Sequence, residues 1–475
     1  MGLAADGEGH RDRMNHPLHD HVPERPGAGR ARSRWWTVGL AGMTGLALTA
    51  AGVAAGPAAD AVARTPTTAG DRPSADDDRR QHDDGKHDDK DKNRGDKEEG
   101  KKEKKPKGVP VPCEADALIA AITLANARGG AVLDLAKDCT YLLTVDIEGA
   151  GLPAITTPIT LNGKNSTITR AAAVDPFRII TVDTGGRLNL NHLKITGGQT
   201  TDNGGGILVN TGGELTVRHG AITRNIASAD GGGISNNGTT RIDNSTVDKN
   251  TAGSSGGGIA STAALEISKS HMSTNTADRG GGVSSAEGVV RIERSAIAAN
   301  HAQSLAGGLL VESGVGIVTD TRITYNAAAD SGGIFVEGGQ FTLRRGALAG
   351  NTASESDGGG LRSNLEVSVV IEDSLVKHNT ANADGGGIYS AGNLVLRHTK
   401  IIGNQAGDQG GGINNESTST ATLFATEVVK NTAVVEGGGI FNEPNGIVEL
   451  NVATGTVVIK NRPDNCSGDV PGCAG

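Results

Sequence analysis

The sequence predicts an all-β protein built as a parallel β-helix of about twelve rungs. A phrase of the form apolar-x-x-Asn, then a short polar stretch, then Gly-Gly-aliphatic occurs ten times between Gly204 and Asn461, with a period of about 26 residues. Repeats of this length are typical of solenoids. At a strand spacing of about 4.8 Å, twelve rungs form a rod about 60 Å long.

A short helix is expected to cover the N-terminal end of the rod. Leu118, Ile119 and Ile122 recur at helical spacing within 114–126, with Leu124 less regular, and an uncovered sheet end would pair with other chains. The strands and irregular first rungs that follow are expected near 132–135, 141–145, 159–161 and 179–182.

The sequence of each repeat predicts three strands and three turns. In residues 231–250 the apolar positions are Ile234, Ile242 and Val247, each too isolated for a helix and each bounded by Gly, Asn, Ser or Thr. A single rung cannot bury these residues, whereas stacked rungs share a continuous core.

The residues that all ten repeats share have structural explanations. The Gly-Gly pairs suit tight turns because glycine adopts positive φ. Asparagine tolerates left-handed backbone, and stacked asparagines hydrogen bond along the rod axis as an amide ladder. The predicted ladder comprises Asn225, Asn250, Asn275, Asn300, Asn326, Asn351, Asn379, Asn404, Asn431 and Asn461.

The pairing of apolar-x-x-Asn with Gly-Gly-aliphatic resembles the repeats of pectin-lyase-fold proteins, which are right-handed, single-stranded parallel β-helices. It is also similar to the repeats of chlamydial polymorphic outer membrane proteins and of secreted actinobacterial β-helix proteins. The resemblance covers about Pro112 to the end of the chain. It implies a right-handed coil and an exported protein.

Three segments are predicted, with boundaries at residues 1–63, 64–111 and 112–475. Arg30, Arg32 and Arg34 precede an apolar run over 35–59, which indicates a signal peptide or, because the run approaches spanning length, an N-terminal anchor. The second segment is expected to be a disordered charged linker, because it is rich in Asp and Lys and poor in apolar residues. The third is the β-helix domain. We therefore expect a secreted or cell-surface protein, with membrane contact through the N-terminal segment alone.

The four cysteines lie at the two ends of the predicted rod. Two local disulfides, Cys113–Cys139 and Cys466–Cys473, are the simplest pairing in an exported protein. A zinc site is the rival interpretation, but no Cys-x-x-Cys supports it.

The residue after each Gly-Gly-aliphatic is expected to point outward, because side chains alternate along a strand. In later repeats this column and the position two residues on carry aromatic, basic and acidic residues, which suit a sugar or a peptide. Scattered exposed aromatic residues, however, also occur without any role. The stripe predicted to bind a ligand comprises Phe335, Arg362, Tyr389, Phe441, Glu312, Glu337, Glu416 and Glu443.

A second column precedes the glycines, with Asp330, Asp357 and Asp384 on three successive rungs. Carboxylates one rung apart repel each other, and a bound Ca²⁺ would relieve that repulsion. The alternative is that aspartate simply suits tight turns. No other cofactor is expected.

The sequence indicates the function of the protein less clearly than its fold. The chain holds 54 acidic and 45 basic residues, and 35 acids and 25 bases remain after Lys107, which argues against a nucleic-acid surface. We expect a structural, adhesive or ligand-binding rod whose partner is a cell-wall or extracellular polysaccharide or a surface protein. The alternative is a polysaccharide-active enzyme, a lyase or a glycoside hydrolase. Hydrolysis needs two positioned carboxylates, and no catalytic motif is recognisable.

Overall fold

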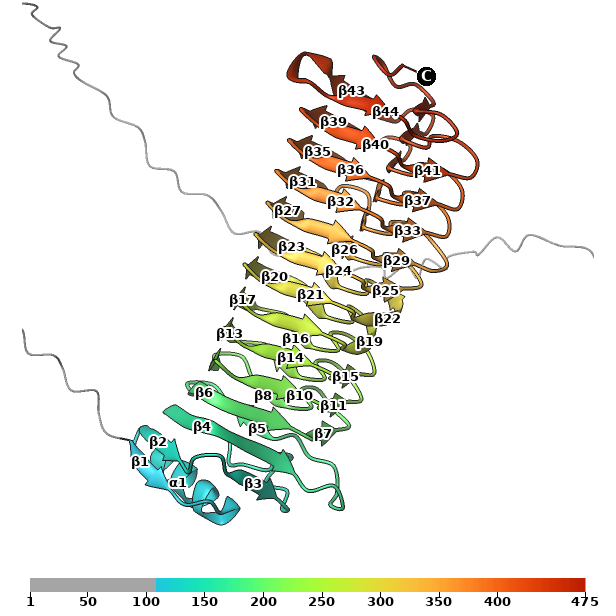
Figure 1. The fold of residues 1–475 in the computed structure, drawn as a ribbon. Helices are drawn as coiled ribbons and strands as arrows, with labels where there is room; N and C mark the ends of the chain where they lie inside the picture. The colour runs from blue at the N-terminus through green and yellow to red at the C-terminus, as the bar shows by residue number, and fades with distance from the viewer. Residues whose placement is uncertain (1–107, 475) are drawn as a thin grey trace, which may run out of the picture. The chain divides into compact units, whose positions relative to one another are not determined.

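The computed structural model describes residues 108–474, which form a parallel β-helix of about fourteen turns (Figure 1). The expected twelve rungs were therefore too few. The predicted export segment and most of the predicted linker lie outside the described residues. The boundary at 112 was wrong, since β1, Val109–Val111, already pairs in parallel with β2, Ala131–Leu135.

A complete rung contains four short strands, one more than predicted. In the rung that begins at Ile234 these are β12 Ile234–Asn236, β13 Thr239–Asp243, β14 Thr246–Asp248 and the dipeptide β15 Thr251–Ala252. β15 was missed because it has one inward side chain, the small Ala252.

The strands fall into four columns with parallel register. The first column is β5 Ile180–Val182, β8 Ile207–Val209, β12 Ile234–Asn236, β16 Ile259–Ser261, β26 Ile334–Val336, β30 Leu361–Ser363, β34 Ile388–Ser390, β38 Ile413–Asn415, β42 Ile440–Asn442 and β45 Cys466–Ser467. The second is β9 Glu214–Arg218, β13 Thr239–Asp243, β17 Ala264–Ser268, β27 Gln340–Arg344, β31 Ser368–Glu372, β35 Asn393–Arg397, β39 Thr420–Phe424 and β43 Ile447–Asn451. Strands β20 Val283–Glu293 and β23 Leu309–Thr319 run through both of these columns.

The third column is β10 Ala221–Thr223, β14 Thr246–Asp248, β18 His271–Ser273, β21 Ala296–Ala298, β24 Arg322–Thr324, β28 Ala347–Ala349, β32 Leu375–Lys377, β36 Lys400–Ile402, β40 Glu427–Val429 and β44 Val457–Ile459. Strands β4 Pro158–Arg170 and β6 Arg187–Thr196 run through the second and third columns. The fourth is β7 Gln199–Thr200, β11 Ile226–Ala227, β15 Thr251–Ala252, β19 Thr276–Arg279, β22 His301–Leu305, β25 Ala327–Ala328, β29 Thr352–Ala353, β33 Thr380–Ala381, β37 Gln405–Ala406 and β41 Thr432–Ala433. β3, Thr140–Leu143, pairs with β4 near the N-terminal end.

The core is one continuous apolar column that runs from Val111 to Val470. Ile234, Ile242 and Val247 are fully or almost fully buried, as predicted, and residues in register on the next rung pack on them. Burying one such side chain contributes about 1.5–3 kcal/mol, so each rung depends on its neighbours.

The ten asparagines lie in register inside the turn between the third and fourth columns. Each side-chain Nδ2 donates to Oδ1 of the next asparagine at 2.9–3.1 Å, over all nine links. Each backbone N–H donates to the same oxygen, as Asn300 does to Asn326 at 3.0 Å. The left-handed conformation belongs instead to the preceding residue, such as Lys249 (φ 56°) or Ala299 (φ 54°).

The glycine pairs are required for close approach of rungs rather than for positive φ. Positive φ occurs at the position before the pair, which Ala306 and Ser331 also occupy, at 57° and 61°. The pair itself is always Gly-Gly, and a β-carbon on Gly233 would lie 2.5 Å from the carbonyl oxygen of Gly258. Side chains at these positions would therefore separate the rungs.

A second ladder, of serine and threonine hydroxyls, was not anticipated. Ser245 N–H donates to Ser270 Oγ at 3.0 Å, and Ser270 N–H to Ser295 Oγ at 3.1 Å. The hydroxyls from Ser245 to Thr426 donate to the carbonyl two residues earlier, as Ser270 does to Ser268 at 2.7 Å. The signal is present in the sequence, because Ser, Thr or Gly always stands five residues before the ladder asparagine.

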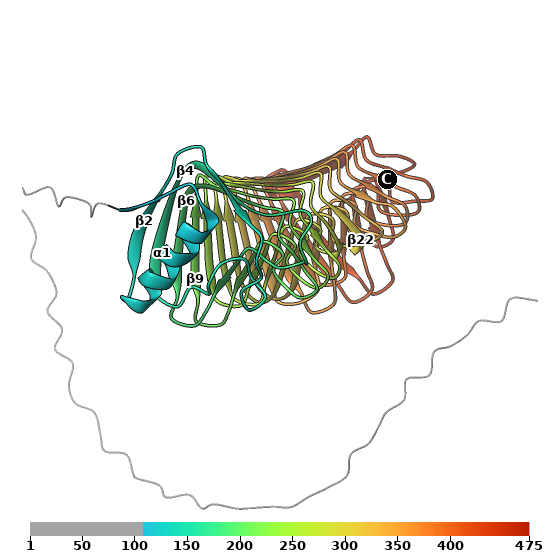
Figure 2. The same cartoon turned by 90° about the horizontal axis from the view of Figure 1, so that it is seen from below.

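Both ends of the rod are covered as expected. The helix α1, Ala115–Ala127, lies across the first turn (Figure 2) and buries Leu118 and Ile122, while Leu124 is exposed. The disulfides are Cys113–Cys139 beside α1 and Cys466–Cys473 at the C-terminal end, next to the 3₁₀ turn η1, Val452–Thr454. Among residues 108–474, no helix has both the length and the apolar character needed to traverse a membrane.

Candidate functional site

The predicted ligand stripe is in register but is covered. Phe335, Arg362 and Tyr389 occupy adjacent positions on β26, β30 and β34. Phe335 and Tyr389 are only 4% and 7% exposed. The glycine turn folds back over the stripe, since a β-carbon on Gly358 would lie 2.6 Å from the Arg362 β-carbon. The expectation of outward, exposed aromatic rings was therefore wrong: strand alternation removes them from the main core, and the turn covers them.

Arg362 is the centre of this stripe. Its guanidinium carbon lies 5.6 Å from the Phe335 ring centre and 5.1 Å from that of Tyr389, within the range of cation–π contact. The guanidinium also contacts Asp330 and lies 3.4 Å from Asp357 Oδ2. Its strongest interactions are thus already made within the chain.

The aspartate column has a different basis from the Ca²⁺ site that the sequence suggested. Arg362 supplies the positive charge that offsets the repulsion between Asp330 and Asp357. Asp357 Oδ1 accepts a hydrogen bond from Asp384 N–H at 3.0 Å, and Asp384 Oδ1 accepts one from Gln409 N–H at 2.8 Å. Within the described part of the chain, no group of three or more His, Cys, Asp or Glu is arranged to hold a metal ion.

The four glutamates of the stripe are dispersed. Glu312 and Glu337 both bind Arg279, at 3.0 and 2.8 Å. Glu416 lies beside Tyr389, and burial together with this carboxylate raises the pKa of the Tyr389 hydroxyl. Glu443 accepts a hydrogen bond from Ser417 Oγ at 3.0 Å.

Phe441 is separated from Tyr389 by the rung of Asn414. The structure therefore brings together Phe335, Arg362 and Tyr389 with two aspartates, and it leaves Phe441 apart.

Burial raises the pKa of several carboxyl groups in the ligand stripe and in the neighbouring aspartate column. It raises the pKa of Glu312 and of Asp330 despite the opposing arginines, Arg279 and Arg362. Burial, aided by the charge of Asp357, raises the pKa of Asp384 to about 6. Such clusters of perturbed carboxyl groups occur at functional sites and also in structural ion-pair networks.

Asp384→Asn is expected to stabilise the rod at pH 7.5 and not at pH 3.5. A raised pKa in the folded state means that ionisation opposes folding. This cost is absent below about pH 4, grows towards pH 6 and is complete above it. Asparagine keeps the acceptor for Gln409 N–H. Because Asp384 is half-buried, we expect a gain of about 1 kcal/mol after solvent screening. Thermal unfolding at both pH values measures the gain. Asp175→Asn, at an exposed position outside the strands, is the control. An equal gain at both pH values would contradict the prediction.

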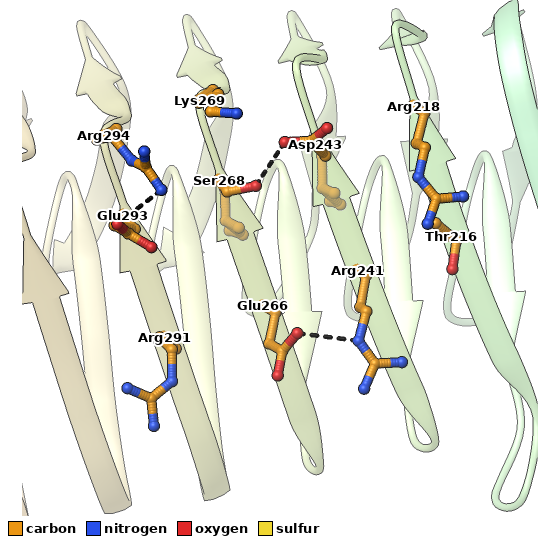
Figure 3. A pocket seen from close by; sticks show the side chains of 12 residues that line it. Thr216, Arg218, Arg241, Asp243, Glu266, Ser268, Lys269, Arg291, Glu293 and Arg294 are labelled. Atoms are coloured by element: carbon orange, nitrogen blue, oxygen red, sulfur yellow. Dashed lines mark hydrogen bonds and ion pairs between the residues drawn. The ribbon is translucent and has the colours of Figure 1, made fainter. Parts of the chain in front are cut away.

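A second candidate site, not anticipated from the sequence, lies on the outer face of the second column. Register aligns Thr216, Arg241, Glu266 and Arg291 on β9, β13, β17 and β20, with Arg218 at the end of β9. Figure 3 shows these side chains projecting from one face. They line a shallow depression of about 380 Å³. Strand alternation marks these residues as outward in the sequence, but their grouping depends on the register between rungs.

Two ion pairs cross or border this depression. Arg241 Nε lies 2.9 Å from Glu266 Oε2, and Arg294 Nη2 lies 2.8 Å from Glu293 Oε1. Asp243 accepts from Ser268 Oγ at 2.7 Å, and this hydrogen bond is the main reason why the pKa of Asp243 is lowered. The surface therefore presents charged groups of both signs, and it is open to solvent.

Comparison with known proteins adds little beyond the fold. No family model and no curated protein matches the sequence. Among solved structures, tailspike protein 3 of bacteriophage CBA120 is similar, with 14% sequence identity and a TM-score of 0.35. The match covers 75% of this chain and 59% of the tailspike chain. Fold and surface thus define a β-helical rod with one covered stripe and one open charged face.

Proposed function

We propose that this chain is an exported rod that acts at the cell surface or outside the cell by binding, in a structural or adhesive role. The observation that carries the proposal is the pair of disulfides, one at each end of the rod. Disulfides persist in oxidising compartments and are rare in the cytosol. The basic and apolar N-terminal sequence is consistent with export.

The regularity of the rod favours binding over catalysis. The hydrogen-bond ladders and the continuous core hold the outer faces in fixed register over many rungs, which suits an extended partner such as a wall or extracellular polysaccharide, or a surface protein. In the predicted ligand stripe, Arg362 already contacts Asp330, Phe335 and Tyr389.

Expression of the full chain in a producing cell tests this proposal. We expect to find the protein in the wall or medium fraction, with all four cysteines unreactive to thiol reagents until they are reduced. Isolated cell walls should retain the purified protein. A Cys466→Ser/Cys473→Ser variant should become more sensitive to heat and proteolysis at its C-terminal end. A cytosolic protein with reduced thiols would overturn the proposal.

A polysaccharide-active enzyme is the second candidate, and it is favoured by one observation. Asp384, whose pKa is raised to about 6, lies near the carboxylate of Asp357, and a general acid needs a raised pKa. Incubation with a polysaccharide panel, followed by assays for reducing ends and unsaturated products, tests this role. Activity that Asp384→Asn abolishes would favour the enzyme, whereas no turnover on any substrate would exclude this assignment for the panel used.

A further inference from the structure

We infer that the depression on β9, β13, β17 and β20 binds a linear acidic glycan, whose repeated carboxylate or phosphate groups contact Arg218 and Arg291. The inference rests on the proposed surface-binding function and specifies the chemistry of the ligand. It concerns the open face of the second strand column, which is distinct from the covered stripe.

The first argument is charge. The depression is lined by five cationic side chains and three carboxylates, which leaves a local charge of about +2 on a domain near −10. Arg241 and Arg294 are paired with carboxylates. The other cations, Arg218, Lys269 and Arg291, form no ion pair with any residue in the range 108–474.

The remaining carboxylate of the depression, Asp243, lies in register with Arg218 and is attracted by the charge of Lys269, but among residues 108–474 it forms no ion pair with either. Asp243 Oδ1 accepts from Ser268 Oγ at 2.7 Å and Oδ2 from Asn244 Nδ2 at 2.9 Å, so its hydrogen-bond partners are neutral groups. Arg218 and Arg291 are exposed and keep their guanidinium donors for a ligand. Guanidinium groups bind carboxylate and phosphate through two parallel hydrogen bonds.

The second argument is geometry. Three rung steps separate Arg218 on β9 from Arg291 on β20. At about 4.8 Å per step, the two strands lie about 14 Å apart along the rod. Figure 3 shows the guanidinium groups of Arg218, Arg241 and Arg291 distributed along this direction. An open, elongated surface of this kind fits a polymer with repeated charges better than a compact molecule, and Thr216 and Ser268 add neutral hydroxyls for sugar contacts.

The third argument separates a glycan from a nucleic acid. Proteins that bind single-stranded nucleic acid combine basic grooves with aromatic rings on which bases stack. The lining of this depression contains no aromatic residue, and three carboxylates lie among its cations. Sugars carrying spaced anions need charge and hydroxyl contacts but no stacking platform.

Affinity measurements on the purified, oxidised full chain test the inference. Labelled polygalacturonate supplies carboxylates, poly(glycerol phosphate) supplies phosphates, and dextran is the neutral control. Arg218→Ala/Arg291→Ala should weaken binding of the acidic polymer about tenfold, since exposed ionic contacts contribute up to about 1 kcal/mol each. Arg322→Ala/Lys377→Ala removes the same charge from the third strand column and should change affinity less than twofold. Rising salt should weaken wild-type binding.

The outcomes decide separately on this site and on the proposed function. If Arg218→Ala/Arg291→Ala weakens binding to only one acidic polymer, the anion of that polymer is the group that the site binds. Weaker binding to both polymers supports a site for either anion. Equal weakening by both double variants, or no wild-type binding to either acidic polymer, overturns the inference. Tight binding of single-stranded DNA that the Arg218/Arg291 variant abolishes overturns the glycan assignment. If isolated walls retain the wild type and this variant equally, the surface-binding function stands and this site does not. Thermal unfolding of each variant confirms that it is folded.

Discussion

Asn326→Ala is expected to destabilise the rod by about 4 kcal/mol. The Asn326 side chain is fully buried and makes four hydrogen bonds: it accepts from the backbone and side chain of Asn300, and donates to Ile297 O and Asn351 Oδ1. Alanine would remove these four buried hydrogen bonds, each of which contributes about 0.5–1.5 kcal/mol, and would leave Asn300 N–H without its acceptor, while Asn351 Oδ1 keeps the Asn326 backbone N–H. Reversible denaturation, followed by circular dichroism, measures the loss.

Two controls define this prediction. Asn393→Ala changes an exposed residue at the start of β35 and should alter stability by less than about 0.5 kcal/mol. Asn461→Ala, at the less buried end of the ladder, should cost less than Asn326→Ala because water can reach its partners. If Asn326→Ala behaves like Asn393→Ala, the ladder does not contribute to stability.

Gly359→Ala is expected to cost about 3 kcal/mol or more. A β-carbon there would lie 2.5 Å from the carbonyl carbon and oxygen of Thr380 and 2.6 Å from the Gly386 oxygen. All three atoms belong to the backbone of the next rung, so the clash cannot be relieved by a side-chain rotation, and overpacking of this kind is costly. We expect a lower unfolding midpoint and faster amide exchange in β33 and its neighbours.

The matched substitution is Gly455→Ala. Gly455 has φ +91° and no atom near its hypothetical β-carbon, so the change adds backbone strain without a clash. It should cost about 1 kcal/mol. A cost for Gly359→Ala no greater than this would show that the rungs adjust to a side chain, and the steric explanation of the Gly-Gly pair would fail.

Much of the fold could be predicted because the same pattern of apolar, asparagine and glycine positions occurs ten times in the sequence. A single Ile242 or Asn326 is uninformative, but recurrence every 26 residues or so distinguishes inward positions, turns and ladder positions from variable ones. The cap helix was predicted within one residue for the same kind of reason, since Leu118 and Ile122 share one helical face. The positions of the hydroxyl ladder, Ser245 and its counterparts, also recur in the sequence. They were missed because serine is equally common in turns.

The candidate site could not be predicted in the same way. The alternation of side chains correctly placed Phe335 and Tyr389 outside the main core, but it could not show that the glycine turn folds over them. Nor could it show that Arg362 lies between their rings and contacts Asp330, 32 residues away in sequence. The Ca²⁺ hypothesis did not take Arg362 into account, because this neutralising cation comes from a different column.

The sequence by itself thus determined the solenoid, its period, its inward positions and the location of its cysteines, because each of these depends on local pattern repeated along the chain. The tertiary structure decided which outer side chains are covered, which charges neutralise each other, and where Arg218 and Arg291 share an open face. Those properties depend on register between rungs and on the path of each turn over its neighbours, and hydrogen bonds between residues about 25 positions apart establish both.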